Sequence, residues 1–216
     1  MKELEQALQG KRVILKAARR AGKTTTAIKW ARNHGGRVIF VVPYSSMVRL
    51  IVNALEFEYS EEIEAIKLNG NEAIVLFKDD AEIRVMAGRY ENAGHLKGLR
   101  ADAIVFDDIN HINEGDAIGM LTAVVHKEDF SIFATSTGDE RGGYKLLKGL
   151  DKVAPLETIS IDYLDLIENG RLSAGDIRYL IDKMSESTFK KEMGPFKKEF
   201  QLRRNNAFFK HLLKKE

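Results

Sequence analysis

Residues 13–30, with the sequence VILKAARRAGKTTTAIKW, constrain the fold more than any other part of the chain. A short apolar run leads into a basic loop that ends in Gly22-Lys23-Thr24, and a helical pattern starts directly afterwards. The segment satisfies the P-loop pattern GxxxxGK followed by Ser or Thr, except at the first glycine, which is Ala17. In such loops successive backbone N–H groups and the positive end of the following helix face the phosphates. The sequence therefore predicts a nucleotide-binding loop, with a basic turn before an amphipathic helix as the alternative.

The spacing within this loop predicts what its residues do. Gly22 allows the backbone to approach the phosphates closely, Lys23 reaches the β- and γ-phosphates, and Thr24 ligates Mg²⁺. The expected cofactors are therefore ATP and Mg²⁺. The loop residues expected to bind the nucleotide are Ala18, Arg19, Arg20, Ala21, Gly22, Lys23, Thr24 and Thr25.

A further candidate for nucleotide binding lies upstream of the loop. A short helix is expected over residues 2–9, and it ends at Gln9. Glutamine upstream of a P-loop often reads the adenine base. A surface position in a charged helix is the alternative reading of the same residue.

A second segment, residues 103–110 (AIVFDDIN), combines a buried strand with carboxylates at its C-terminal end. Open α/β sheets bind their ligands at this end of the strands. Asp107 is expected to hold Mg²⁺ together with Thr24, as in a Walker B element, and Asp108 is expected to activate the attacking water. A strand that merely ends in a polar turn is the alternative, and the upstream P-loop argues against it.

Other apolar segments predict the remaining strands. Residues 37–43 (RVIFVVP) form a continuous β-branched run, which is typical of a parallel strand buried on both faces. Residues 63–87 instead predict an antiparallel meander at the sheet edge, with an Asn-Gly turn. Further strands are expected at residues 131–134 and 156–161. The expected fold class is α/β, a P-loop ASCE-type NTPase with a mostly parallel central sheet.

Small hydroxyl residues follow one of these strands, as Thr135-Ser136-Thr137. At a strand end beside a nucleotide they suit a sensor of the γ-phosphate, and a simple turn is the alternative.

Helical spacing predicts two helices in the first part of the chain. The P-loop helix is expected to run from Lys23 to His34. Ser45 or Ser46 is expected to cap the next helix. The inward residues of that helix are expected to be Met47, Leu50, Ile51, Ala54 and Leu55.

The character of the chain changes after residue 170. Ser173 and Ser185 each open an expected helix. The tail, residues 196–216, is basic with interleaved phenylalanines, which suits a nucleic-acid grip; a solvated amphipathic helix is the alternative. The expected division is a P-loop ATPase core over residues 1–170 and a C-terminal helical segment with a basic tail over residues 171–216.

Composition excludes several classes of function. The chain has 216 residues and no cysteine, so disulfides, zinc-thiolate sites and a cysteine nucleophile are excluded. Its 34 basic and 32 acidic side chains nearly balance, so net charge implies no partner. No apolar run approaches the ~20 residues that cross a membrane, and the N-terminus lacks the apolar core of a signal peptide. We expect a cytoplasmic protein without a membrane partner.

As an ordered set, these motifs resemble the ATPase domain of a viral large terminase, the motor that packages DNA into procapsids. Residues 18–25 (ARRAGKTT) are similar to the family's deviant Walker A motif, which also lacks the first glycine and carries an arginine. Residues 41–44 (VVPY), 96–102 (LKGLRAD) and 134–138 (ATSTG) resemble its second-strand, lead-in and coupling motifs. Residues 189–196 (FKKEMGPF) resemble the segment that closes its ATPase domain.

The resemblance, which covers residues 10–200, implies an ATP-hydrolysing motor that moves double-stranded DNA into a procapsid in the host cell cytoplasm. It also implies that Arg19 senses or stabilises the γ-phosphate in cis. Thr135, Ser136 and Thr137 would couple hydrolysis to movement of the C-terminal helices against DNA. A homo-oligomeric ring on a portal is the expected working assembly, with a monomer in isolation as the alternative.

The sequence departs from the family pattern in several places. The second acid is Asp108 where the family has glutamate, so its carboxylate is set back by about one bond length. Glu114 is a distant substitute for it. Lys97 stands where the family has an arginine that acts in trans, and lysine lacks the bidentate fork, so Arg100 or Arg89 is the alternative trans finger. The family's nuclease half is not in this sequence, and a nuclease domain or partner is expected elsewhere.

Two further functions fit the same motifs. One is another nucleic-acid-dependent P-loop ATPase of the helicase kind, although 216 residues leave no room for a second motor domain. The other is a nucleotide-binding assembly protein with weak or no hydrolysis, because the side chain of Asp108 is short.

Overall fold

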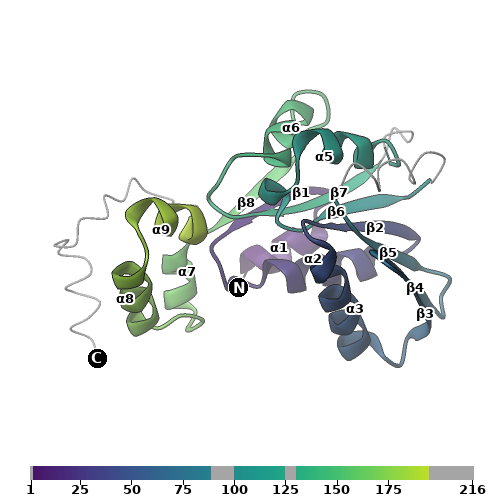
Figure 1. Ribbon diagram of the computed structural model, residues 1–216, viewed down its shortest axis with the longest axis horizontal. Helices are drawn as coiled ribbons and strands as arrows, with labels where there is room; N and C mark the ends of the chain where they lie inside the picture. The colour runs from purple at the N-terminus through teal and green to yellow at the C-terminus, as the bar shows by residue number, and fades with distance from the viewer. Residues whose placement is uncertain (1, 89–99, 125–129, 195–216) are drawn as a thin grey trace.

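The structure is a computed structural model that describes residues 2–88, 100–124 and 130–194. These residues form an eight-stranded sheet with helices on both faces (Figure 1). The strands are β1 (Arg12–Ala17), β2 (Arg37–Val42), β3 (Ile63–Asn69), β4 (Glu72–Phe77), β5 (Glu82–Ala87), β6 (Ala103–Phe106), β7 (Ser131–Ser136) and β8 (Glu157–Ile161). The helices are α1 (Lys2–Gln9), α2 (Lys23–His34), α3 (Ser45–Tyr59), the 3-10 turn η1 (Ile109–His111), α5 (Glu114–Leu121), α6 (Gly143–Leu150), α7 (Tyr163–Glu168), α8 (Ala174–Lys183) and α9 (Glu186–Met193).

The strand order is β3-β4-β5-β2-β6-β7-β1-β8, which confirms the predicted α/β class and the meander at the sheet edge. Neighbouring strands from β5 to β8 in this order are parallel, whereas β3 pairs with β4 and β4 pairs with β5 in antiparallel fashion. Every residue of β6 and β7 is buried, as expected for parallel strands covered on both faces.

The two faces of the sheet bury separate apolar clusters. Because side chains alternate along a strand, Val38 and Phe40 of β2 pack with residues of α1, α2 and α3, whereas Ile39 and Val41 pack with residues of α5 and α6. Figure 1 shows α5 and α6 on one side of the sheet and α1, α2 and α3 on the other. Among the described residues, no helix is both long and apolar enough to span a bilayer.

The strand order brings the sequence motifs together. Strands β6, β7 and β1 are neighbours and run parallel, so the segments after their C-terminal ends leave the same edge of the sheet. These segments carry the predicted Walker B acids, the hydroxyl residues 135–137 and the predicted P-loop. Ligands of open α/β sheets bind at this edge.

Helix α2 agrees with its prediction, whereas α3 agrees only in part. Helix α2 has the predicted bounds, Lys23–His34. In α3 the prediction is partly wrong, since Tyr44 is the N-cap residue, no side chain caps the helix, and Leu50 is 63% exposed. Val48 and Val52 are buried instead, because the face that packs on the sheet is rotated from the one periodicity indicated.

The C-terminal helices are anchored to the main core. Ser173 caps α8 and forms a capping box with Asp176, which confirms the prediction that a helix begins after Ser173. Helix α7 was not predicted, although Asp162 and Asp165 form a capping box at its start. Tyr163 belongs to the same apolar cluster as α1 and α2, together with buried residues of α8 and α9. The division at residue 170 stays a prediction, and the basic tail lies outside the described residues.

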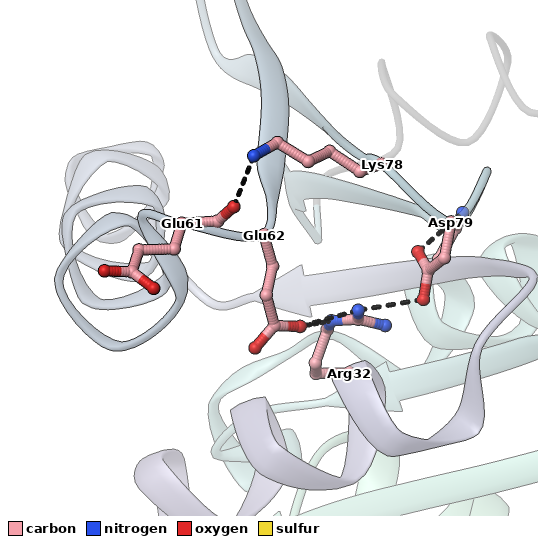
Figure 2. A network of polar contacts seen from close by, with 6 residues as sticks. Arg32, Glu61, Glu62, Lys78 and Asp79 are labelled. Atoms are coloured by element: carbon pink, nitrogen blue, oxygen red, sulfur yellow. Dashed lines mark hydrogen bonds and ion pairs between the residues drawn. The ribbon is translucent and has the colours of Figure 1, made fainter.

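A polar network joins α2 to the meander (Figure 2). The Nη2 atom of Arg32 lies 2.7 Å from an oxygen of Glu62 and 2.8 Å from an oxygen of Asp79. The guanidinium also lies over the ring of Phe77, 4.5 Å from its centroid. The hydrogen bond from Arg32 lowers the pKa of the Asp79 carboxyl. Lys78 adds a bond of 2.7 Å from its Nζ to the carbonyl oxygen of Glu61.

We expect Arg32→Ala to lower the melting temperature by roughly 2–6 °C, because a guanidinium with two carboxylate partners and a ring contact is lost. The matched control is Lys29→Ala on the same helix, which removes one exposed ion pair with Glu58 of 2.9 Å. Exposed pairs contribute little, so this change should shift the melting temperature by less than about 2 °C. Thermal unfolding followed by circular dichroism measures both, and equal shifts would contradict a special role of Arg32.

Candidate active site

The P-loop connects β1 to α2 through two residues with left-handed backbone. Gly22 is the N-cap of α2 with φ of 87°, and Arg20 has φ of 64°. Alternation of left- and right-handed residues turns successive N–H groups toward one concave side, which is how backbone binds anions. Ala18 and Ala21 are fully buried and hold the outer side of the loop in the core. The loop conformation is therefore one that can hold phosphates.

Lys23 points back across this loop. Its side chain is buried, and Nζ donates to the carbonyl oxygens of Ala17 at 3.2 Å and Ala18 at 3.3 Å. Burial lowers the pKa of the Lys23 amine, and the charges of Asp108 and Asp107 oppose that shift. Both acceptors are neutral carbonyls, so an anionic phosphate would be a stronger partner for this ammonium.

Asp107 links the P-loop helix to the strand-end acids. It is fully buried, and its Oδ2 accepts a hydrogen bond of 2.9 Å from the hydroxyl of Thr24. Its Oδ1 accepts another, of 2.8 Å, from the hydroxyl of Thr135. Burial and then the neighbouring Asp108 raise the pKa of Asp107 to about 6, against the effect of both hydrogen bonds. A nearby cation would favour the charged carboxylate.

Asp108 follows in an uncommon conformation. Its backbone is left-handed, with φ of 48° and ψ of 53°, and its N–H donates to the hydroxyl oxygen of Thr135 at 2.7 Å. Its Oδ1 is buried and has no hydrogen-bond partner among the described residues. A buried carboxylate oxygen of this kind can accept a hydrogen bond from a bound water or ligand. Glu114, considered as a substitute, is exposed in the first turn of α5.

The remaining strand-end hydroxyls bond to the segment after β6. The hydroxyl of Thr137 accepts from the Nδ2 of Asn110 at 3.2 Å, and the Ser136 hydroxyl donates to the Oδ1 of Asn110 at 3.4 Å. These three side chains are buried. The structure therefore brings Thr135, Ser136 and Thr137 into contact with the segment that carries Asp107 and Asp108.

Other candidates lie elsewhere. Gln9 borders a cavity of about 560 Å³ with Trp30, His34 and Asp102, at the end of β1 away from the P-loop, so the structure does not bring it to the loop. Six strand residues of about 3.3 Å each separate the two ends. Arg100 is exposed before the start of β6, also away from the P-loop of its own chain. The other proposed trans fingers, Arg89 and Lys97, lie outside the described residues.

Residues of the C-terminal helices and of the connection between α7 and α8 contact the P-loop, and sequence reasoning missed these contacts. The Nε of Arg19 lies 2.6 Å from a carboxylate oxygen of Glu192, and Arg20 lies 3.9 Å from Asp176. The Nη1 of Arg171 donates to the carbonyl oxygen of Ala21 at 3.1 Å. These contacts join segments that are distant in the sequence, and no local motif indicates them.

The donor set fits Mg²⁺. The hydroxyl of Thr24 and the carboxylate of Asp107 are hard oxygen ligands held close together, 2.9 Å apart. Among the described residues, no group of three or more acidic, histidine or cysteine side chains could hold a metal by itself. Mg²⁺ in nucleotide sites takes one or two protein ligands and completes its shell with phosphate oxygens and water.

No protein-family profile matches the sequence, and no curated protein is significantly similar to it. The structure is similar to the large terminase of a thermophilic bacteriophage, with a TM-score of 0.68, 11% identity, and coverage of 90% of this chain and 53% of that one. The same terminase in complex with ADP matches with a TM-score of 0.62, 14% identity, and coverage of 87% and 51%. The large terminase ATPase domain of Thermus phage P74-26 matches with a TM-score of 0.60, 14% identity, and coverage of 86% and 88%.

These comparisons establish the fold. The chain has the fold of the large terminase ATPase domain, which confirms the predicted α/β architecture and supports the resemblance at the level of fold. The chain spans about half the length of the first of these terminases.

Proposed function

We propose that this protein is an ATP-hydrolysing motor of the large terminase kind, which drives double-stranded DNA into a procapsid. The observation that carries the proposal is the chain of hydrogen bonds from Thr24 through Asp107 and Thr135 to the N–H of Asp108, within this fold. It joins a P-loop to two strand-end acids, as Mg²⁺-dependent hydrolysis of ATP requires.

The P-loop residues bind the triphosphate. Lys23 exchanges its two carbonyl partners for β- and γ-phosphate oxygens, and the N–H groups at the start of α2 donate to the same phosphates. The backbone of the loop residues Ala18, Arg19, Arg20, Ala21, Gly22, Thr24 and Thr25 encloses them. Thr24 and Asp107 would hold Mg²⁺, which supplies positive charge for the phosphates when bound.

Asp108 orients the attacking water and accepts its proton. Its buried, unpartnered Oδ1 is the oxygen available for that bond. Arg19 stabilises the γ-phosphate in cis. Thr135 touches both acids, so a change at the γ-phosphate reaches β7. Thr135, Ser136 and Thr137 then couple it to movement of the C-terminal helices against DNA.

A neighbouring subunit completes the site in the proposed assembly. Lys97, Arg100 or Arg89 supplies the trans finger to the next P-loop in a homo-oligomeric ring on a portal. The nuclease activity that packaging requires comes from another domain or partner, and the motor works in the host cell cytoplasm.

The proposal is tested by ATP turnover per molecule across protein concentration, with and without double-stranded DNA. An arginine finger is worth about 10³–10⁵ in rate, so we expect slow turnover in dilute protein and a steep rise with concentration and duplex DNA. The control is single-stranded DNA of equal length, together with a strand-separation assay.

The other outcomes separate the alternatives. Strand separation would indicate a helicase-type ATPase. Tight ATP binding without phosphate release, even at high concentration on duplex DNA, would indicate a nucleotide-binding assembly protein. The assembly protein is an alternative because the side chain of Asp108 is one methylene shorter than that of glutamate.

A further inference from the structure

Arg19 of the P-loop is held by Glu192 of α9 at two points. The backbone N–H of Arg19 donates to the carbonyl oxygen of Glu192 at 3.0 Å, and its Nε lies 2.6 Å from the carboxylate of the same residue. Backbone and side chain of one loop residue are thus bound to backbone and side chain of one residue on α9.

The ion pair uses only part of the guanidinium. Nε is the atom of Arg19 that meets the Glu192 carboxylate, whereas an arginine presents further N–H groups on its two terminal nitrogens. An arginine side chain loses considerable rotamer freedom when it is ordered. The side chain of Arg19 is 63% exposed, so little else restrains it. Glu192 therefore orders Arg19 while leaving donors for an oxyanion.

Glu192 lies on a helix that is anchored in the core. Its neighbours on α9, Phe189 and Met193, are each 1% exposed, and the ring of Phe189 packs edge-on against Tyr163 with centroids 5.9 Å apart. A polar side chain held by such buried anchors can hold another residue in a fixed geometry. The charges of Arg19 and Glu192 both act on the Lys23 ammonium, so the pair lies beside the phosphate-binding centre.

We propose that Glu192 is a positioning residue, which holds Arg19 through its backbone N–H and its Nε so that the terminal guanidinium nitrogens meet the γ-phosphate. This role rests on the proposed function. It makes recognition of the third phosphate depend on the docking of α9. ADP lacks that phosphate and does not use the arrangement.

The test compares dissociation constants for ADP and for the non-hydrolysable analogue AMP-PNP, both with Mg²⁺. Ordering one long side chain costs about 0.5–1.5 kcal/mol, so we expect Glu192→Ala to lower the preference for AMP-PNP over ADP by about 2- to 10-fold. The ADP constant should stay unchanged. Glu192→Gln retains an oxygen that can accept from Nε and should give an intermediate loss.

Two controls separate positioning from general effects. Glu168→Ala makes the same substitution at an exposed site, the last residue of α7, and should leave the preference unchanged. Arg19→Ala should lower the preference by itself, and adding Glu192→Ala should lower it no further. Circular dichroism of each variant checks that α9 remains folded, and Glu192→Gln keeps the test valid if Glu192→Ala unfolds.

An unchanged preference in both Glu192 variants would overturn the role of Glu192 and leave the proposed function intact. A higher preference would show that Glu192 competes with the γ-phosphate for Arg19, which also overturns it. If the unmodified protein binds neither nucleotide, the proposed function fails and the role of Glu192 fails with it.

Discussion

Replacing Lys23 by alanine is expected to reduce ATP turnover by about 10²–10³-fold, the effect of removing one preorganised donor to developing charge. Lys23 is buried at 8% exposure and reaches across the loop to the carbonyl oxygens of Ala17 and Ala18. Alanine leaves the loop backbone in place but removes the ammonium that would meet the β- and γ-phosphates. Steady-state phosphate release measures turnover, and a fluorescent nucleotide measures binding, which should weaken as well.

Lys29→Ala is the matched control for this change. Lys29 lies on the same helix, and its amine forms an exposed pair with Glu58. Its loss removes the same charge and should leave turnover within about 2-fold, because surface charges far from the site act weakly through screening solvent. If Lys23→Ala binds and hydrolyses ATP as well as the unmodified protein, the proposed function is wrong.

Asp108→Asn is expected to lower turnover by about 10²–10⁴-fold, the contribution of a general base, while ATP binding changes little. Asparagine has nearly the same shape as aspartate and tolerates left-handed backbone, so the φ of 48° at this position is retained. The backbone N–H of residue 108 keeps its bond to Thr135. The change therefore removes proton acceptance without disturbing the loop.

Asp80→Asn is the matched control for Asp108→Asn. Asp80 also has a left-handed backbone, with φ of 64°, but it lies in the turn between β4 and β5. The same chemical change there should leave turnover unaltered. Full activity of Asp108→Asn in a protein that hydrolyses ATP would mean that another acid activates the water, and the assignment of Asp108 would fall.

Patterns of adjacent residues predicted those parts of the site that are formed by one continuous segment of the chain. The P-loop, the bounds of α2 and the strand before Asp107 each follow from a pattern of a few adjacent residues. The Asn-Gly turn likewise predicted the antiparallel pair β3–β4. In each case the physical cause is short-range, because backbone preferences and side-chain alternation act over neighbouring positions.

Other features arise from packing between distant segments, and no local pattern carries them. Arg171 and Ala21 are 150 positions apart, and their hydrogen bond depends on where α7 docks. Gln9 has the right residue type for an adenine contact, but α1 places it at the far end of β1. Leu50 has the right periodicity for a core position, but the rotation of α3 about its axis exposes it. The left-handed backbone of Asp108 was also unexpected, since its stabilising partner, Thr135, comes from another strand.

The single hydroxyl of Thr135 fixes the direction of donation in the hydrogen bonds at the strand ends. A hydroxyl carries one proton, and here that proton goes to Asp107 while the oxygen receives the N–H of Asp108. This direction holds only while the Oδ1 of Asp107 is a bare acceptor. Because burial raises the pKa of Asp107 to about 6, the carboxyl is mostly ionised at neutral pH, and only a proton on Oδ1 itself would free the hydroxyl to turn. The ionisation of one buried acid thus sets which way a neighbouring dipole points.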